Sequence, residues 1–314
     1  MQNIKNFLIA FGVGIIMFGI LAIIITQTVK TDTTDKNDRE TSATPVGEDG
    51  EISDDGNELP YSGGRTFTAV VGGYDSDSGE LDGLVFIKAD KEHKRFVIAA
   101  IPTSSSVTVT STDPASGNSV KTNVRIKDFP RLFRDSEKDT KIVDTVHAIT
   151  GMKIDYYAFF TTSAAMSLFD KTGGLYYTVP QNMVYVGNGT EENPEINLSA
   201  GGQVLSSKQI IQLLRFASYT TDERKNDARR AQVHADFMSE ALIQILKKSS
   251  GELSNGIVDI LAACETNFSV SDFKNNYDII SCFEEYKKNS VITSVELSDP
   301  LEYTYTQKFF ENYK

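Results

Sequence analysis

Hydrophobic and polar residues are distributed in three different ways along the chain. Residues 7–25, FLIAFGVGIIMFGILAIII, contain no charged side chain. Residues 31–63 are rich in Asp, Glu, Thr, Ser and Gly and contain almost no large apolar residue. From residue 65 onward, short apolar runs of strand character are interspersed with segments of helical periodicity. The chain is therefore expected to consist of an apolar segment, a polar connector and one folded region.

The apolar segment is predicted to be a transmembrane helix over residues 7–26. At a rise of about 1.5 Å per residue, its uncharged run nearly crosses a hydrocarbon core of about 30 Å. A cleavable signal peptide is the alternative, but its apolar region is normally about 7–15 residues long and ends at a small-x-small site. We find no such site between Leu21 and Thr28. The helix is therefore interpreted as an uncleaved membrane anchor.

The connector, residues 27–64, is predicted to be a disordered acidic stalk, because it cannot bury enough apolar surface to offset its chain entropy. Its acidic character places it outside the cell, with residues 1–6 in the cytoplasm. The sequence thus predicts a single-pass protein of the cell membrane with an extracellular domain over residues 65–314.

The folded region is predicted to contain strands and helices in mixed order. The expected strands lie at residues 66–75, 81–90, 94–102, 153–162, 175–180 and 290–297, and the second and third form a hairpin. The expected helices lie at residues 137–151, 163–174, 206–219, 227–248 and, less regularly, 252–286. This order predicts an α/β fold with one mixed sheet covered by helices on both faces.

Composition excludes several classes of function. The 314 residues carry a net charge of -12, which argues against bulk binding of DNA, RNA or anionic lipid. Two cysteines and three histidines provide few ligands for a zinc site. Outside the membrane, Cys264 and Cys282 either form a disulfide or remain two buried thiols. A serine hydrolase is disfavoured, because the serines at 104–106 lack a glycine-flanked turn and no histidine has a clear partner.

Two carboxylates lie at predicted strand ends. Asp75 follows the first strand, and Asp82 stands at the entrance of the second. Oxygen ligands converging at one edge of a sheet suit Mg²⁺, which binds through one or two carboxylates and substrate phosphates. The alternative is that both residues only stabilise turns, where Asp is favoured.

A local excess of basic residues is the second charged feature. Arg215 ends a predicted helix, and Arg224, Lys225, Arg229 and Arg230 follow within fifteen residues. In an acidic chain this cluster favours an anionic partner, since arginine binds phosphate oxygens through a planar fork. Local pairing with the nearby acidic side chains of residues 222, 223 and 227 is the competing interpretation.

Seven short segments follow one another along the chain in a recognisable order. They are VVGGYD, LDGLVFIKADKEHKRFVIAAIP, TGMKIDYYAFF, SLFDKTGGLYYTVP, LSAGGQVLSSKQIIQLLRF, the arginine-rich helix ending near Gln232, and CETNFSVSDF. In this order the chain resembles the LytR-CpsA-Psr family of cell-envelope glycopolymer transferases over about residues 66–297. The resemblance implies an α/β/α sandwich that binds a polyprenyl-pyrophosphate-linked teichoic acid or capsular polysaccharide, with Mg²⁺ and a rim of arginines. It also implies transfer of the glycopolymer to peptidoglycan.

The resemblance assigns roles to individual residues. Asp75 and Asp82 match the two metal carboxylates, and Arg215 matches the first arginine of an Arg-x-Arg pair. In the following helix, catalytic roles are implied for Arg229 and Arg230, although the spacing differs by a residue or more. The residues implied in substrate binding are Thr103, Ser104, Ser105, Arg224 and Gln232.

Three positions depart from the family pattern. The arginine two residues before the second carboxylate is Glu80, the Arg-Asp after Ile-Pro is Thr103-Ser104, and the second arginine of the pair is Ala217. Hydroxyl groups can still hydrogen-bond a phosphate or a sugar, but they do not neutralise charge. Two hypotheses follow: a glycopolymer transferase with a divergent site, and a catalytically weakened relative that binds lipid or glycan as a scaffold.

Overall fold

The computed structural model describes most of the predicted folded region. The described residues are 66–75, 78–112, 117–133, 135–187, 195–247, 264–269, 272, 276, 282–295 and 303–313. The predicted transmembrane helix and stalk lie outside them. Within the described ranges, no helix has both the length and the apolar character needed to cross a bilayer.

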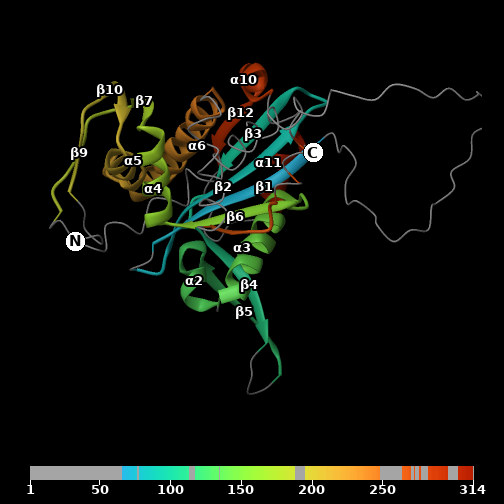
Figure 1. The fold of residues 1–314 in the computed structure, drawn as a ribbon. Helices are drawn as coiled ribbons and strands as arrows, with labels where there is room; N and C mark the ends of the chain where they lie inside the picture. The colour runs from blue at the N-terminus through green and yellow to red at the C-terminus, as the bar shows by residue number, and fades with distance from the viewer. Residues whose placement is uncertain are drawn as a thin grey trace, which may run out of the picture.

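A six-stranded mixed sheet forms the centre of the molecule, with strand order β11-β6-β1-β2-β3-β12 (Figure 1). Its strands are β1 (Thr66–Tyr74), β2 (Leu81–Asp90), β3 (Arg95–Ala100), β6 (Tyr156–Thr161), β11 (Cys264–Thr266) and β12 (Val291–Ser294). The β1–β2, β2–β3 and β6–β11 pairs are antiparallel. The β1–β6 and β3–β12 pairs are parallel. The predicted α/β class with one mixed sheet is confirmed.

The central strands are apolar on both faces, because both faces are covered. In β1, Phe67, Ala69 and Val71 belong to one buried cluster, whereas Val70 and Tyr74 belong to the other. Successive side chains of a strand point to opposite faces, so a strand covered on both sides is a nearly continuous apolar run. The pattern TFTAVVGGY in β1 has this character.

Helices form a layer on each side of the sheet (Figure 1). The first buried cluster contains side chains of α4 (Thr162–Thr172), α5 (Ser207–Arg215) and α6 (Glu223–Lys247), as well as α10 (Phe283–Tyr286). The second contains those of α3 (Asp135–Thr150) and α11 (Tyr303–Glu311), with the short α2 (Phe129–Leu132) and the 3-10 turn η2 (Ile126–Asp128). On this side, the rings of Phe86 and Phe310 meet edge to face with their centroids 5.5 Å apart.

Three two-stranded sheets surround the central one. They are β4 (Ser106–Thr112) with β5 (Ser119–Arg125), β7 (Leu175–Val179) with β10 (Gly201–Leu205), and β8 (Met183–Tyr185) with β9 (Ile196–Leu198). The β4–β5 hairpin extends away from the body of the molecule (Figure 1). These small sheets, apart from β7, have no counterpart among the predicted strands.

Most predicted elements are confirmed within a few residues, but one prediction is wrong in its central part and right at its end, where α10 is helical. The expected helical segment 252–286 contains strand β11, which forms one edge of the sheet and pairs antiparallel with β6. The Thr266 hydroxyl reinforces this pairing by donating to the carbonyl oxygen of Tyr157 at 2.6 Å. Backbone pairing with an open sheet edge therefore overrides the weak helical pattern. Cys264 and Cys282 do not form a disulfide.

Candidate functional site

The hairpin between β1 and β2 positions the two predicted metal carboxylates. Gly73 pairs with Gly83 and Tyr74 pairs with Leu81, so Asp82 is the extra residue of a β-bulge. A bulge redirects the side chain of the inserted residue and ends regular pairing. Asp75 directly follows β1. Both carboxylates consequently lie at the same end of the sheet.

Backbone groups of the hairpin loop hold Asp75 in place. Its Oδ1 accepts a hydrogen bond from the Ser78 amide at 3.2 Å, and its carbonyl oxygen accepts one from the Gly79 amide at 2.9 Å. Gly79 has a φ of +65°, a conformation that glycine adopts without steric cost. Asp75 therefore also acts as the turn residue that the alternative interpretation proposes.

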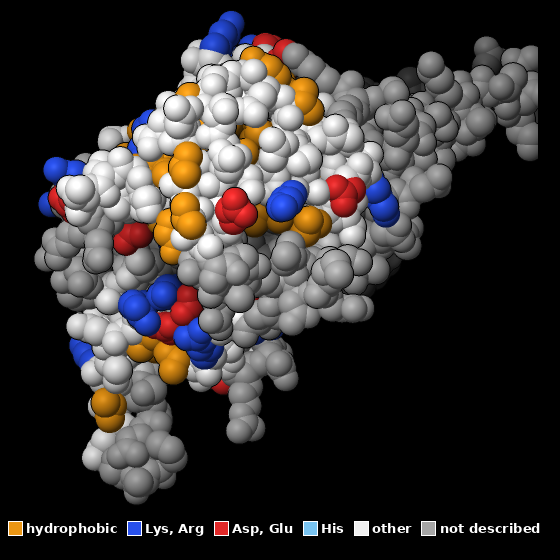
Figure 2. Space-filling view, turned by 90° about the vertical axis from the view of Figure 1, so that its left-hand side faces the viewer, with side chains coloured by type: hydrophobic (Ala, Val, Ile, Leu, Met, Phe, Trp, Pro, Cys, Tyr) orange, Lys and Arg blue, Asp and Glu red, His pale blue; other side chains and the backbone are white. Residues whose placement is uncertain are grey.

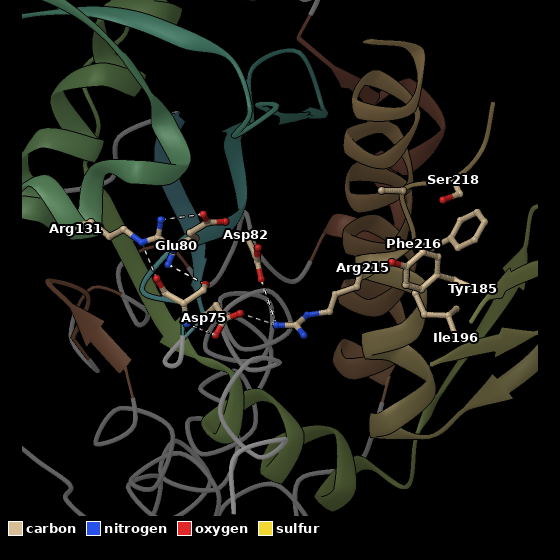
Figure 3. Close-up of a pocket in the computed structure, with 11 residues that line it drawn as sticks. Asp75, Glu80, Asp82, Arg131, Tyr185, Ile196, Arg215, Phe216 and Ser218 are labelled. Atoms are coloured by element: carbon tan, nitrogen blue, oxygen red, sulfur yellow. Dashed lines mark hydrogen bonds and ion pairs between the residues drawn. The ribbon is translucent and has the colours of Figure 1, made fainter. Parts of the chain in front are cut away.

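Arg215 reaches both carboxylates from the end of α5. Its Nη2 lies 2.9 Å from Asp75 Oδ2 and 3.6 Å from Asp82 Oδ2. Helix α5 begins with a capping box in which Ser206 and Gln209 satisfy each other's backbone amides, and it ends at Arg215. Phe216 then turns into extended backbone and is buried. This helix end directs the guanidinium toward the sheet (Figure 3).

These three residues line a pocket of about 570 Å³. Its other charged lining residues are Glu80 and Arg131, and its apolar wall includes Tyr185, Ile196 and Phe216. Figure 3 shows the carboxylates of the β1–β2 hairpin between Arg131 on one side and Arg215 on the other. Figure 2 shows basic and acidic side chains gathered close together on one face of the molecule. Such a mixed-charge pocket beside an apolar wall suits an amphipathic anion or a metal-bound one.

The environment of Asp82 disfavours its charged form. Burial raises the pKa of the Asp82 carboxyl to about 7, and the neighbouring carboxylates of Asp75 and Glu80 add to the rise. The attraction of the Arg215 and Arg230 guanidinium groups opposes it. A second cation in this pocket would restore the charged form, because an opposite charge nearby lowers a carboxyl pKa.

Glu80 has two basic partners that sequence reasoning missed. Lys127 Nζ lies 3.1 Å from Glu80 Oε2, and Arg131 Nη1 lies 3.1 Å from Glu80 Oε1. Both bases come from the segment that follows the β4–β5 hairpin, and Lys127 is 47 positions from Glu80. No local spacing in the sequence links this segment to the site. Only the tertiary fold brings these groups together.

The hydroxyl segment after β3 lies beside the pocket without being among its lining residues. Thr103 is buried, and its hydroxyl lies 3.5 Å from the backbone carbonyl oxygen of Asp82. Ser104 donates to Asp227 Oδ2 at 2.7 Å. Ser105 is buried, and its hydroxyl has no hydrogen-bond partner among the described residues. The Thr103 hydroxyl therefore lies against the hairpin, and the Ser104 hydroxyl holds the start of α6.

The basic helix α6 is only partly directed toward the site. Arg230 is half-buried and close enough to Asp82 to lower its pKa, whereas Arg229 is exposed. Gln232 is engaged by β12: its Oε1 accepts from the Ser294 amide at 3.1 Å, and its Nε2 donates to Asp236 at 2.9 Å. The backbone of Arg224 belongs to α6, but its side chain lies outside the described part of the structure.

The donor set at Asp75 and Asp82 fits Mg²⁺ in its chemistry. Hard carboxylate oxygens are its preferred ligands, and one or two of them suffice when water and substrate phosphates complete the shell. No cluster of three or more His, Cys, Asp or Glu residues suited to a metal occurs among the described residues. A cation at this site would therefore need ligands in addition to the described carboxylates.

Comparisons with solved structures show the same fold in several bacterial proteins. A protein described as a transcription regulator from Eubacterium siraeum is 17% identical, with a TM-score of 0.58 over 87% of this chain and 99% of that chain. The LytR-Csp2A-Psr enzyme from Actinomyces oris is 15% identical, with a TM-score of 0.54 over 80% and 90%. TagT bound to LIIa-WTA is 14% identical, with a TM-score of 0.54 over 79% and 89%.

A sequence comparison with curated proteins found no match. A family model described as the LytR_cpsA_psr family matches residues 23–311, which include the whole sheet, both helical layers and the pocket. The chain therefore belongs to the LytR-CpsA-Psr family.

Proposed function

We propose that this protein is a membrane-anchored extracellular transferase that moves a polyprenyl-pyrophosphate-linked glycopolymer onto peptidoglycan. The observation that carries the proposal is the meeting of Asp75, Asp82 and Arg215 in one pocket. These residues come from the end of β1, the bulge in β2 and the end of α5. The glycopolymer is of the teichoic acid or capsular polysaccharide type.

The pocket has the groups that transfer at a pyrophosphate requires. Phosphoryl transfer depends mainly on positioning and on stabilising the charge that spreads over the phosphoryl oxygens. Arg215 is held by Asp75 with its guanidinium directed into the pocket, so it can orient the pyrophosphate and stabilise this charge. Asp75 and Asp82 would hold Mg²⁺, which supplies charge neutralisation and polarises phosphoryl oxygens when bound. The apolar wall at Tyr185, Ile196 and Phe216 offers a surface for the first isoprene units.

Relatives and sequence support the substrate class and the location. One structure of the same fold is TagT bound to a lipid-linked wall teichoic acid precursor. The uncharged run at residues 7–25 supports a membrane anchor, and the acidic segment 27–64 supports an extracellular stalk. An anchored domain on a stalk is placed between the lipid-linked donor in the bilayer and peptidoglycan outside it.

The test is transfer by the full-length protein. The purified protein is incubated with a polyprenyl-pyrophosphate-linked glycan, peptidoglycan and Mg²⁺, and the glycan that becomes attached to peptidoglycan is measured. We expect transfer that EDTA abolishes and that Asp82→Ala or Arg215→Ala reduces at least a hundredfold. The exposed Asp144→Ala in α3 is the matched control and should keep full transfer, because Asp144 is not among the lining residues of the pocket. Transfer unaffected by both site variants would contradict the proposal.

A binding or scaffold role is the second candidate, and one observation favours it. With the carboxylate of Glu80, the pocket has more acidic than basic lining residues, and Ala217, which also lines it, adds no charge. A pyrophosphate would then be held weakly without a cation. If the polyprenyl lipid co-purifies with the protein while no pyrophosphate bond is cleaved in the presence of Mg²⁺, the scaffold role replaces the transferase.

A further inference from the structure

The charged groups on the hairpin side of the pocket form a unit of their own. Glu80 bridges two bases, Lys127 and Arg131, which both come from the segment after the β4–β5 hairpin. Of these three residues, Glu80 and Arg131 line the pocket. Arg131 stands opposite Arg215, with the hairpin carboxylates between them (Figure 3). The pocket therefore has a cation on two opposing sides.

Arg131 is positioned by a backbone group and is not tightly bound by Glu80. Its Nε donates to the Ser78 carbonyl oxygen at 2.6 Å, which fixes the plane of the guanidinium at the loop. The contact with Glu80 involves a single nitrogen, Nη1, rather than a two-bond fork. The Arg131 side chain is 46% exposed and that of Glu80 is 21% exposed. Ion pairs with this exposure are weak because water screens them.

A phosphate group is a stronger partner for Arg131 than the carboxylate it now contacts. Phosphate carries more charge and offers three oxygens that the planar guanidinium can engage through two parallel hydrogen bonds. The described contacts of Arg131 use Nε and Nη1, so Nη2 is not engaged among the described residues. Displacement of the Glu80 carboxylate by a phosphate would thus exchange one weak contact for a forked one. The Glu80 carboxylate would keep its ion pair with Lys127 after the phosphate displaces it from Arg131.

We propose that Arg131 is a substrate-binding residue of the pocket. Its guanidinium contacts the Glu80 carboxylate until the phosphate of an anionic ligand displaces that carboxylate. This inference rests on the proposed function for the identity of the ligand, a pyrophosphate. Glu80 is thereby a competitor built into the site: its carboxylate keeps Arg131 near the pocket and lowers the affinity for phosphate. The two opposing guanidinium groups, Arg131 and Arg215, contact the ligand from both sides.

The test is direct binding of inorganic pyrophosphate to the full-length protein by isothermal titration calorimetry at low salt with Mg²⁺ present. We expect Arg131→Ala to weaken binding about tenfold to a hundredfold, in line with loss of a charge-assisted contact. Arg131→Lys should recover part of this loss, because the charge remains without the fork. Glu80→Gln should strengthen binding about threefold to tenfold, because it removes the competing charge.

Arg125→Ala is the matched control. Arg125 lies six positions from Arg131, and its side chain is 52% exposed. Both arginines pair with Asp128, but Arg125 is not among the lining residues of the pocket. Its loss should leave pyrophosphate affinity unchanged. Circular dichroism of each variant verifies the fold.

Two results would overturn the role of Arg131. If Arg215→Ala weakens binding while Arg131→Ala and Glu80→Gln leave it unchanged, Arg131 is not a ligand residue, and the proposed transferase function stands. If the unaltered protein does not bind pyrophosphate at all, the role of Arg131 and the anion site of the proposed function fail together. Transfer activity with the polyprenyl-linked donor then decides independently whether the transferase proposal survives.

Discussion

Replacing Asp82 with asparagine should reveal the cost of holding this carboxylate inside the pocket. In the folded protein, burial and the two neighbouring carboxylates raise the pKa of Asp82 to about 7. In the unfolded chain the group has its ordinary value of 3.8. The folded state therefore retains a proton between these two pH values that the unfolded state releases. Stability from this group is fully present below about pH 4 and is lost as pH rises through about 7.

The size of the effect follows from the shift. One pKa unit corresponds to about 1.36 kcal/mol, so a rise of about three units corresponds to about 4 kcal/mol. The Asp82 side chain is 25% exposed, and solvent screening reduces this value, so we expect about 2–4 kcal/mol. Asparagine does not titrate. The stability of Asp82→Asn relative to the unaltered protein should thus rise by this amount between pH 4.5 and pH 8.

Urea unfolding of the full-length protein at several pH values measures this difference. The chain has no tryptophan, so the transition is followed by far-ultraviolet circular dichroism, in EDTA to keep divalent cations from the pocket. Other carboxylates titrate in both proteins and cancel in the difference. Asp144→Asn reports the effect of removing an exposed carboxylate. A difference between Asp82→Asn and the unaltered protein that stays constant within about 0.5 kcal/mol across this range would refute the reasoning. Arg215 would then outweigh burial.

Three further substitutions test other parts of the structure. Gly72→Ala should destabilise the protein by about 1–3 kcal/mol in urea unfolding, because a Cβ there would lie 2.7 Å from the Phe159 ring; unchanged stability would mean that the ring moves freely. Tyr74→Phe should cost about 1–3 kcal/mol, because it removes the hydroxyl that donates to the buried Asp139, and a neutral result would show that another group or water replaces it. Gln232→Ala should lower stability through the lost contacts with β12 and leave pyrophosphate affinity unchanged; weaker binding in a fully stable variant would instead support a substrate role for this residue.

The sequence predicted the central sheet well because its strands are buried on both faces. The runs in β1, β2 and β3 are long and apolar, and their boundaries are marked by glycine, proline or charged turns. The α4 helix was equally clear, since its end is fixed by Gly173 with a φ of +71°. Strand β11 was missed because three residues on an exposed sheet edge carry no periodicity of their own.

The candidate site was predictable only where its residues adjoin recognisable elements. Asp75, Asp82 and Arg215 follow directly from strand and helix ends, and they meet in the pocket. Arg131 and Lys127 lie in a short helical turn after an unpredicted hairpin, so their pairing with Glu80 depends on long-range packing. Gln232 is not among the lining residues of the pocket, and its side chain bonds the backbone of β12, so its substrate role stays a prediction.

The position of α11 has a consequence for how this domain folds. Phe310 covers Phe86 in the second strand, and Lys88 donates to the backbone carbonyl of Tyr313, 225 positions away. Strand β12 likewise completes the sheet beside β3 only after most of the chain has been made. Contacts between such distant segments form slowly and leave apolar surface exposed until they do. The part of this face that α11 covers, around Phe86, therefore remains uncovered until residues 303–313 have been synthesised. A nascent chain therefore completes this part of its core only after residues 303–313 have been made, and its apolar surface is exposed to aggregation and proteolysis until then.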